Sequence, residues 1–507
     1  MSRDARRRPL LPALAGAALL MASCAAQDRE PEEVGCGGLE LSAPAPEQSV
    51  VVVVGDTLRR ATPGAYGGSA KTPTLDRVAR EGILFARAYS PAPWTKPAVA
   101  SLFTSLHPSQ HRAWTHPVSE DERGGDAGVI RTTDVLDARL GTLAEVYREA
   151  GFATAAFVAN PWLVSSFGFA QGFDTYDDSF ARWEAPGAEL SRVAISWLEA
   201  LPRDRRFFLY LHYIDPHRPY GPLDPEETRA LAATLRSDLR PLPGDARKMV
   251  KLYARYPGGG TPESDGILPS LALLELSYRK GVERFDDALG AFLAGLHTRR
   301  GRNSHALVVT SDHGESLYAH GFGNHGSSLY EDEVAIPLLM QLPGVSPAPA
   351  RSTCPVSLID LMPVLCRYSG LPCPADAAGG DAIFAGGAPP QPHLVVEGQR
   401  TSRRNRGLIG ERYKLIWQPD RRAGEAPYRL YDLSADPDET RDLLAGGAVA
   451  DETRAAFERL RHALPGAVAP RARARSERVP VDPELAERLR ALGYAEGDES
   501  EASPAGP

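Results

Sequence analysis

Cysteine, basic clusters and long apolar runs are all scarce in this chain. It contains five cysteines among 507 residues, and none forms a Cys-x-x-Cys pair, so a cysteine-based zinc site is not expected. The formal net charge is −8 and no basic block lies in the body of the chain, which argues against nucleic-acid binding. No segment reaches about 18 uninterrupted apolar residues, so no transmembrane helix is predicted.

What is present is typical of a globular protein. Hydrophobic residues make up 43% of the chain and charged residues 24%, so wholesale disorder is not expected. A chain of 507 residues is longer than a single small domain needs to form its core. We therefore expect one large α/β domain with a smaller appended unit.

The N-terminal segment has the pattern of an exported bacterial lipoprotein. Four arginines within residues 3–8 precede an apolar stretch over residues 10–21, and Ala22 and Ser23 then lead to Cys24. This predicts a signal peptide over residues 1–24 and a lipidated Cys24 that tethers the chain to a membrane of the cell envelope. A plain secretory signal with an incidental cysteine is the alternative. Export would also permit disulfides, and Cys366 and Cys373 form the closest pair in sequence.

Alternating strand and helix patterns indicate a parallel sheet flanked by helices. Buried-type strands are predicted at residues 51–54, 153–159, 207–211, 306–310 and 336–342. Helical patterns separate them at residues 72–82, 133–151, 189–201 and 268–296, and another follows at 358–368. Near the C-terminus, strands are predicted at 393–397, 413–417 and 428–433, and helices at 451–464 and 482–492.

Composition shifts place the domain boundaries. The segments rich in Pro, Gly, Ser or Ala interrupt the alternation and are expected to be linkers, insertions or tails. The predicted units are a linker at 25–47, a main domain at 48–373 with an insertion at about 221–265, a linker at 374–392, a C-terminal subdomain at 393–495 and a disordered tail at 496–507.

Chemically active side chains follow four of the predicted buried strands. Asp56 follows the first, Asn160 the second, the stretch 212–217 the third, and Asp312 with His313 the fourth. In an open parallel sheet, ligands bind outside the carboxyl ends of the strands. A single Asp or His in a loop is more often a turn former or a surface residue, but four at one edge predict a site. Carboxylate and imidazole together suit a divalent cation.

Thr95 supplies a candidate nucleophile for this site. It lies just before a segment, residues 97–102, that has the pattern of a helix start with Pro97 in the first turn. A helix N-terminus presents free amide groups to an anion. The simpler interpretation is a helix-capping threonine. A metal ion on the hydroxyl would lower its pKa and favour attack on an ester.

Short motifs connect these positions to a known family. They are Asp56-Thr57-Leu58-Arg59, Trp94-Thr95-Lys96-Pro97, Asp215-Pro216-His217-Arg218-Pro219-Tyr220, Ser311-Asp312-His313-Gly314-Glu315 and His325-Gly326. In this order they resemble the sulfatase branch of the alkaline-phosphatase-like superfamily, from about residue 51 to residue 371. The resemblance implies an α/β fold with a central, mostly parallel sheet flanked by helices and a small C-terminal α+β subdomain.

The resemblance also implies roles for individual residues. Metal-ligand positions match Asp56, Thr95, Asp312 and His313, and the nucleophile position matches Thr95. His217 and His325 match positions that contact the ester group, so both are candidate catalytic residues. Further candidates for substrate binding are Asn160, Asp215, His320 and Lys96.

Departures from the sulfatase pattern concern the nucleophile above all. Sulfatases convert a Cys or Ser to formylglycine, and the threonine at this position is not a substrate for that conversion, so formylglycine is not expected. Val99 stands at the family's arginine position, and Ala159 and Pro161 stand where a lysine and a histidine usually hold sulfate. Thr57 replaces a second acidic ligand. The ligand set of Asp56, Thr95, Asp312 and His313 is closer to that of relatives with a threonine nucleophile. These relatives are the phosphoglycerol and phosphoethanolamine transferases and the nucleotide pyrophosphatase/phosphodiesterases.

The sequence thus predicts a metal-dependent hydrolase or transferase of sulfate or phosphate esters. One divalent ion is expected, Mn²⁺, Zn²⁺, Mg²⁺ or Ca²⁺. Whether a second ion is held by Asp215, His217 and His325 is left open by the sequence. The substrate would be a sulfated or phosphorylated glycan, lipid or small molecule. The alternative is a catalytically inactive envelope protein that keeps the fold for binding.

Overall fold

A computed structural model describes the central parts of the chain. The residues described are 30–114, 132–181, 186–234, 271–321, 323–326, 328–398, 405–419, 426–446, 449–468 and 477–492. Cys24, the predicted tail at 496–507 and most of the predicted insertion at 221–265 lie outside them. Of that insertion, the structure shows helix α6 (Pro225–Thr234). None of the described helices is long and apolar enough to cross a bilayer.

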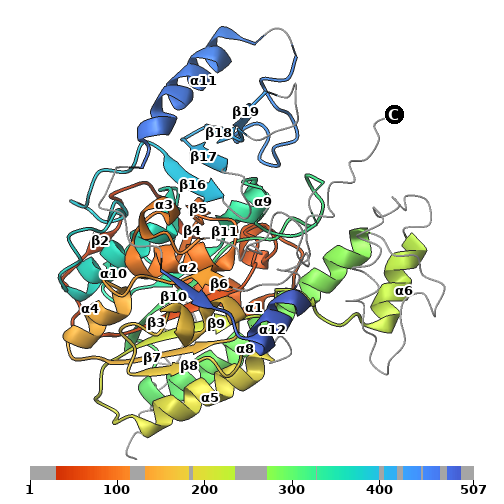
Figure 1. Ribbon diagram of the computed structural model, residues 1–507. Coiled ribbons are helices and arrows are strands. Elements are labelled where there is room, and N and C mark those ends of the chain that lie inside the picture. Colours follow the sequence, from red (N-terminus) through yellow and green to blue (C-terminus); the bar gives the residue numbers. More distant parts are fainter. Residues whose placement is uncertain are drawn as a thin grey trace, which may run out of the picture.

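A nine-stranded, mostly parallel sheet forms the centre of the main domain (Figure 1). Strand β12 pairs antiparallel with both of its neighbours, β10 and β4, and the other pairs in the sheet are parallel. The spatial order is β1 (Glu32–Val34), β14 (Ala350–Ser352), β4 (Ile83–Phe85), β12 (Leu338–Gln341), β10 (His305–Thr310), β3 (Ser49–Gly55), β9 (Phe207–Tyr213), β7 (Ala153–Val158) and β8 (Thr175–Asp177).

The central strands are apolar because both faces of the sheet are covered. Val50 to Val54 of β3 are all fully buried, as expected for a parallel strand between two helical layers. Helices α1 (Pro73–Glu81), α5 (Gly187–Ala200) and α8 (Leu271–Arg300) pack together, and α2 (Thr95–Thr104), α4 (Leu143–Glu149) and α10 (Leu361–Ser369) form a second group. The predicted fold class is confirmed, including the strands at 51–54, 153–159, 207–211 and 306–310.

One predicted helix is wrong in its first half. The pattern at 133–151 forms a helix only from Leu143, where Thr142 caps the N-terminus by accepting from the Glu145 amide. Before it, β6 (Thr132–Asp134) is a strand that pairs with β20 (Arg478–Pro480), near the other end of the chain. Such a partner, more than 300 residues away in sequence, leaves no local signal in the sequence.

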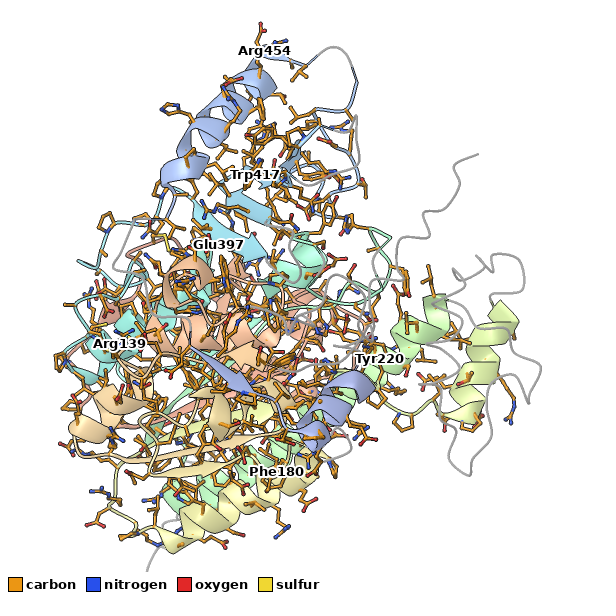
Figure 2. All side chains as sticks on the ribbon, in the orientation of Figure 1. Arg139, Phe180, Tyr220, Glu397, Trp417 and Arg454 are labelled. Carbon is orange, nitrogen blue, oxygen red and sulfur yellow. A yellow bond between two sulfur atoms is a disulfide. The ribbon has the colours of Figure 1, made fainter. Side chains whose placement is uncertain are left out.

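A four-stranded antiparallel sheet forms the core of the C-terminal subdomain. Its order is β16 (Leu394–Gly398), β17 (Asn405–Ile409), β18 (Tyr413–Trp417) and β19 (Tyr428–Asp432), and helix α11 (Asp451–Ala463) lies against it. Figure 2 marks its extent by Glu397, Trp417 and Arg454. A buried ion-pair network ties this sheet to the main domain, since Lys414 Nζ lies 3.0 Å from both Glu331 and Glu439.

The two predicted linkers are built into the main domain wherever the structure describes them. In the segment 25–47, β1 pairs parallel with β14, and β2 (Glu40–Leu41) pairs antiparallel with β13 (Val345–Ser346). In the segment 374–392, Phe384 is buried and bridges to Leu39. Composition alone therefore misjudged both segments, because their partners are distant in sequence.

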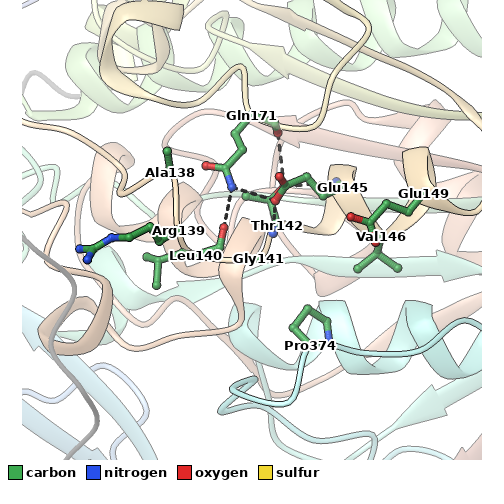
Figure 3. A pocket seen from close by; sticks show the side chains of 10 residues that line it. All are labelled: Ala138, Arg139, Leu140, Gly141, Thr142, Glu145, Val146, Glu149, Gln171 and Pro374. Carbon is green, nitrogen blue, oxygen red and sulfur yellow. Dashed lines mark hydrogen bonds between the residues drawn. The ribbon is translucent and has the colours of Figure 1, made fainter.

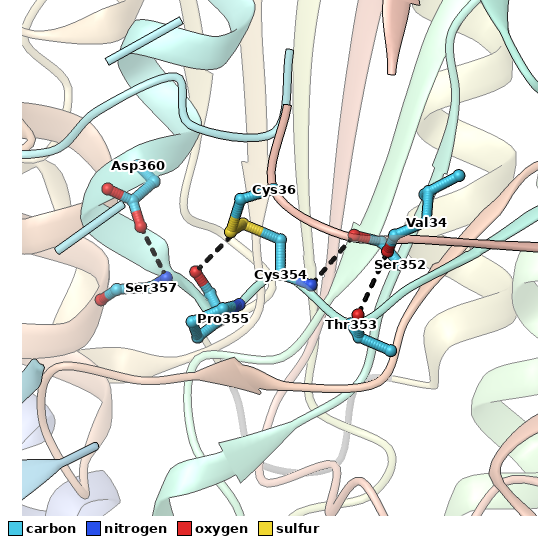
Figure 4. Close-up of a disulfide and its surroundings, with 8 residues drawn as sticks. All are labelled: Val34, Cys36, Ser352, Thr353, Cys354, Pro355, Ser357 and Asp360. Atoms are coloured by element: carbon cyan, nitrogen blue, oxygen red, sulfur yellow. Dashed lines mark hydrogen bonds between the residues drawn. A yellow bond between two sulfur atoms is a disulfide. The ribbon is translucent and has the colours of Figure 1, made fainter. Parts of the chain in front are cut away.

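A disulfide fixes the first of these segments. Cys36 is bonded to Cys354, which lies 318 residues further along the chain (Figure 4). Cys366 and Cys373, the closest pair in sequence, are not disulfide-bonded. The fold brings the segment of strand β1 against the end of β14, which places Cys36 next to Cys354.

Removing this disulfide should lower stability without abolishing the fold. We expect Cys36→Ser to lose about 2–5 kcal/mol of unfolding free energy, because the bond closes a very long loop. Thermal unfolding of oxidised wild type and the variant measures the loss. Cys373→Ser is the control, and an equal loss in that variant would contradict the assignment of the bond.

Candidate functional site

Four adjacent strands bring the predicted residues to one edge of the sheet. β10, β3, β9 and β7 are neighbours in that order, and they lead into Asp312 and His313, Asp56, the turn after His212, and Asn160, respectively. Helix α2 adds Thr95 as its first residue. The side chains of Asp56, Thr95, Asn160, His212, Asp312 and His313 are all fully buried.

Asp56, His212 and Asp312 form the centre of this cluster. One ligand atom from each lies within 4.8 Å of the others, which makes this the candidate metal-binding group found among the described residues. His212 Nε2 is 3.3 Å from Asp56 Oδ2 and 3.9 Å from Asp312 Oδ2. On its other side, His212 Nδ1 contacts the Tyr210 hydroxyl at 2.8 Å, a second contact that fixes the ring as expected for a metal-binding histidine.

Two carboxylate oxygens in this cluster fit a divalent cation. Asp56 Oδ1 and Asp312 Oδ2 are buried, and neither has a hydrogen-bond partner among the described residues. Burying such an atom without compensation is costly. Two carboxylates and imidazole nitrogens at one point are donors that Mn²⁺ and Zn²⁺ accept readily. The residues present therefore fit a divalent ion.

The His313 ring directs the lone pair of its Nε2 toward Thr95 and the two carboxylates. Its Nδ1 lies 2.8 Å from the Gly314 carbonyl oxygen. Because a carbonyl only accepts, Nδ1 carries the proton and Nε2 of the neutral ring is an acceptor. That Nε2 is 3.4 Å from Asp312 Oδ2, 3.8 Å from Asp56 Oδ1 and 3.2 Å from Thr95 Oγ1.

The Thr95 hydroxyl is held between two side chains. It lies 3.2 Å from His313 Nε2, which accepts its proton, and it accepts from Asn160 Nδ2 at 3.2 Å. Asn160 Nδ2 also donates to Asp56 Oδ2 at 2.5 Å. Thr95 begins α2 and is not its cap, since Trp94 holds the N-cap position. The hydroxyl thus lies next to the first free amides of a ten-residue helix.

A second pair of imidazoles borders the cluster. The rings of His313 and His325 are 4.5 Å apart, and those of His325 and His217 are 5.0 Å apart. His325 Nδ1 lies 3.3 Å from the buried carboxylate of Glu315. His217 Nδ1 donates to the Arg218 carbonyl at 2.7 Å. The two histidines therefore differ in what they can do with a proton.

Burial and neighbouring charges shift the pKa values of these groups in different directions. Burial alone would raise the pKa of Asp56, but His217, His212 and His313 together hold it well below its usual range. Burial and the nearby charge of Asp56 raise the pKa of Asp312. Burial also raises the pKa of Glu315 and lowers that of His217. Such opposed shifts are typical of functional sites.

The backbone beside Asp56 is strained. Thr57 has φ 59°, a left-handed conformation that a β-branched residue rarely adopts. The turn is held by the Thr57 amide, which donates to Asp312 Oδ1 at 3.2 Å, and by the Tyr278 hydroxyl, which donates to the Thr57 carbonyl at 2.7 Å. Strain of this kind persists only where the surroundings fix it, and it is common beside active sites.

The structure does not bring Asp215, His320 or Lys96 into the cluster. Asp215 Oδ1 instead accepts from the Gly187 amide at the start of α5. His320 stacks on Tyr330 and contacts Asp332 and the Asp438 carbonyl. Because Asp215 faces α5, the second-ion set of Asp215, His217 and His325 is not assembled among the described residues.

Lys96 Nζ also points away from the nucleophile beside it. The ammonium donates to Thr133 Oγ1 at 2.6 Å and lies over the rings of Trp162 and Phe167. Burial lowers the pKa of Lys96 to about 7, against an opposing effect from Asp134. The sequence predicted substrate binding from its position next to Thr95, whereas its contacts are to the protein.

Sequence reasoning assigned no role to His212 or Glu315. His212 lies within β9, where it was counted among the residues after a buried strand without a role. The pairing of Val54 with His212 places it directly beside Asp56. Alternation along a strand puts Tyr210 and His212 on one face, so two polar rings on one face of an apolar strand were the available signal.

An open pocket of about 240 Å³ lies elsewhere on the main domain (Figure 3). None of the cluster residues lines it. Its floor is closed by local hydrogen bonds, such as those from Gln171 Nε2 to Leu140 and Glu145. The pocket therefore belongs to the region around α4 and not to the cluster.

Comparisons with known proteins identify the family and the fold. The sulfatase family model matches residues 48–371. The delta 4,5-hexuronate-2-O-sulfatase of Bacteroides thetaiotaomicron is 22% identical over 427 residues, which cover 78% of this chain and 84% of that protein.

Solved structures share the fold. The structure of BT4656 in complex with its substrate D-glucosamine-2-N,6-O-disulfate has a TM-score of 0.61 at 17% identity, covering 90% of this chain and 100% of that one. The phosphonate monoester hydrolase of Agrobacterium radiobacter has a TM-score of 0.60 at 21% identity, covering 82% and 95%. Because the family model covers well over half of the chain, the protein belongs to the sulfatase family of ester hydrolases.

Proposed function

We propose that this protein is a metal-dependent hydrolase of phosphate or sulfate esters whose nucleophile is the unmodified Thr95. The observation that carries the proposal is the position of the Thr95 hydroxyl, between His313 Nε2 and Asn160 Nδ2 and beside the Asp56 and Asp312 carboxylates. A buried, oriented hydroxyl with a proton acceptor is the arrangement that nucleophilic catalysis needs.

The residues of the site divide the work between them. Asp56, His212 and Asp312 would hold one divalent ion, which when bound lowers the pKa of a coordinated hydroxyl and neutralises charge on ester oxygens. Asn160 and the amides at the start of α2 orient the anionic group. His313 Nε2 accepts the Thr95 proton, and the oxygen attacks the central atom to form a covalent threonyl ester.

His325 is the better candidate for the general acid. The Glu315 carboxylate on its Nδ1 stabilises the protonated ring, which can donate to the leaving alcohol from Nε2. His217, whose pKa burial lowers, has its Nδ1 proton bonded to the Arg218 carbonyl, so in the neutral ring its Nε2 is suited to accept a proton or a hydrogen bond from the substrate. Water, activated by the deprotonated His325, then attacks the threonyl ester and restores Thr95.

Phosphate esters match this nucleophile better than sulfate esters. A threonyl phosphate can be hydrolysed by attack at phosphorus, whereas a threonyl sulfate lacks the escape route that a formylglycine hydrate provides. Sulfate ester hydrolysis is the second candidate, because the similar proteins include sulfatases, one with a substrate of D-glucosamine-2-N,6-O-disulfate. The assembled buried cluster disfavours the alternative of an inactive binding protein.

A substrate panel tests the proposal. Purified protein loaded with Mn²⁺ or Zn²⁺ is assayed on an aryl phosphate, a phosphate diester, a phosphonate monoester and an aryl sulfate. We expect turnover of at least one phosphorus ester, exceeding turnover of the aryl sulfate. A product assay with added alcohol separates hydrolysis from transfer. If the metal-loaded protein hydrolysed none of the four esters, the proposal would be wrong.

We further propose that the protein is an envelope lipoprotein anchored through Cys24. The sequence before Cys24 motivates this, and the Cys36–Cys354 disulfide supports an oxidising compartment. Intact-mass measurement of protein purified from bacterial membranes should show a chain that begins at Cys24 and carries acyl groups. A Cys24→Ser variant should be released in soluble form. An unacylated chain in the wild type would contradict the anchor.

A further inference from the structure

We propose that the C-terminal segment, residues 477–492, is a positioning element of the catalytic site that holds the loop of His217 and the start of helix α2. The segment lies within the predicted C-terminal subdomain, residues 393–495, but in the structure it packs on the main domain (Figure 1). The inference rests on the proposed function, because it assigns the segment to the same reaction.

Strand β20 connects this segment to the helix of the nucleophile. β20 pairs antiparallel with β6, with Arg478 opposite Asp134 and Val479 opposite Thr133. An ion pair of 3.3 Å between Arg478 and Asp134 reinforces the pairing. Thr133 is the residue whose hydroxyl accepts from Lys96 Nζ at 2.6 Å. Strand β20 therefore pairs with β6, and Thr133 of β6 binds Lys96, the residue next to Thr95.

Helix α12 (Pro483–Ala491) connects the segment to the histidine loop. The Leu492 carbonyl, just after the helix, accepts a hydrogen bond of 2.8 Å from Arg218 Nη2. Arg218 is almost fully buried and directly follows His217, whose Nδ1 donates to the Arg218 carbonyl. The Leu492 carbonyl thus fixes the side chain of the residue whose own carbonyl binds His217.

Burial shows that the segment is part of the main core. Leu485, Leu489 and Leu492 are at most 5% exposed and belong to the core cluster of the main domain, and α12 contacts the turn η2 (Pro161–Leu163) that follows Asn160. A segment that only stabilised the fold could dock anywhere on the main domain. This one contacts the turn after Asn160 and the arginine after His217, and through β6 it reaches Lys96 beside Thr95, and so we infer positioning of these groups.

A pair of matched leucine variants tests the inference in the full chain. Leu489→Ala removes core packing of α12, and Leu460→Ala removes the same group from α11 in the C-terminal subdomain, where Leu460 is 3% exposed. Both should lower Tm. Leu489→Ala should lower kcat by about 10- to 100-fold with little change in KM, because loosened catalytic groups lose alignment. Leu460→Ala should keep the wild-type kcat.

Two further measurements keep the test decisive. Leu489→Met preserves volume and should restore kcat to near the wild-type value. Hydrogen exchange at residues 214–220, which needs no substrate, should be faster in Leu489→Ala than in Leu460→Ala. If wild type were inactive on every ester, the proposed function would fail, and the exchange data would still test the docking. If Leu489→Ala lost stability but kept both kcat and slow exchange at 214–220, the positioning role would be wrong.

Discussion

Replacing Thr95 with alanine is expected to lower kcat for the preferred ester by on the order of 10⁴-fold or more, as removal of a catalytic nucleophile does elsewhere. The variant loses the hydroxyl that contacts His313 and Asn160 but keeps the helix in which it lies. Thr95→Ser keeps an oxygen at this position and should retain a measurable part of the activity. Steady-state kinetics on the same metal-loaded preparation measures both.

Thr104→Ala is the matched control for this prediction. Thr104 ends the same helix, is equally buried, and uses its hydroxyl only for a bond to the Ala100 carbonyl. Its loss should lower stability slightly and leave kcat unchanged. If Thr95→Ala kept more than about a tenth of the wild-type kcat, Thr95 could not be the nucleophile, and His313 or a bound water would have to take that role.

Replacing Asp312 with asparagine is expected to raise the stability of the metal-free protein and to weaken its affinity for metal. In the metal-free protein, Asp312 is a buried carboxylate close to Asp56, and this repulsion contributes to its raised pKa. Neutralising it should raise the Tm of the metal-free protein, because one buried like charge is removed. The same change removes a ligand and should weaken metal affinity by at least about 10- to 100-fold, the range found even for groups that only support ligands.

Metal content and thermal shifts measure this prediction without an activity assay. Wild type should gain Tm on addition of Mn²⁺ or Zn²⁺, and Asp312→Asn should not. His212→Gln should also lose the gain, which tests the ligand that sequence reasoning missed. Asp332→Asn is the control, since Asp332 is a buried carboxylate that contacts His320 outside the cluster. An unchanged metal-dependent gain in His212→Gln would exclude His212 from the site.

Much of the site was predictable because strand ends are marked in the sequence. Asp56, Asp312 and His313 directly follow continuous apolar runs, and parallel pairing brings such ends together. His212 was missed because it lies inside its strand, where its role depends on the register with β3. Asp215 was misplaced because only Pro216 separates it from His217 in sequence, yet its carboxylate turns to the start of α5.

The fold shows the same division between local and distant information. The sheet and its helices follow from periodic patterns of short range. The strands at 32–34 and 478–480 depend on partners more than 300 residues away, and nothing local marks them. The Cys36–Cys354 bond is equally distant, so spacing could not have predicted it. These non-local contacts are also the ones on which the proposed role of the C-terminal segment depends.

Direct detection of the threonyl ester tests the central claim most sharply. Metal-loaded protein is mixed with a slowly hydrolysed aryl phosphate, quenched in acid and digested, and the peptide containing Thr95 is analysed by mass spectrometry. We expect a peptide carrying one phosphoryl group on Thr95, absent when substrate is omitted and absent in Thr95→Ser, where serine carries the group instead. Turnover in the same sample with the Thr95 peptide unmodified throughout the reaction would contradict it.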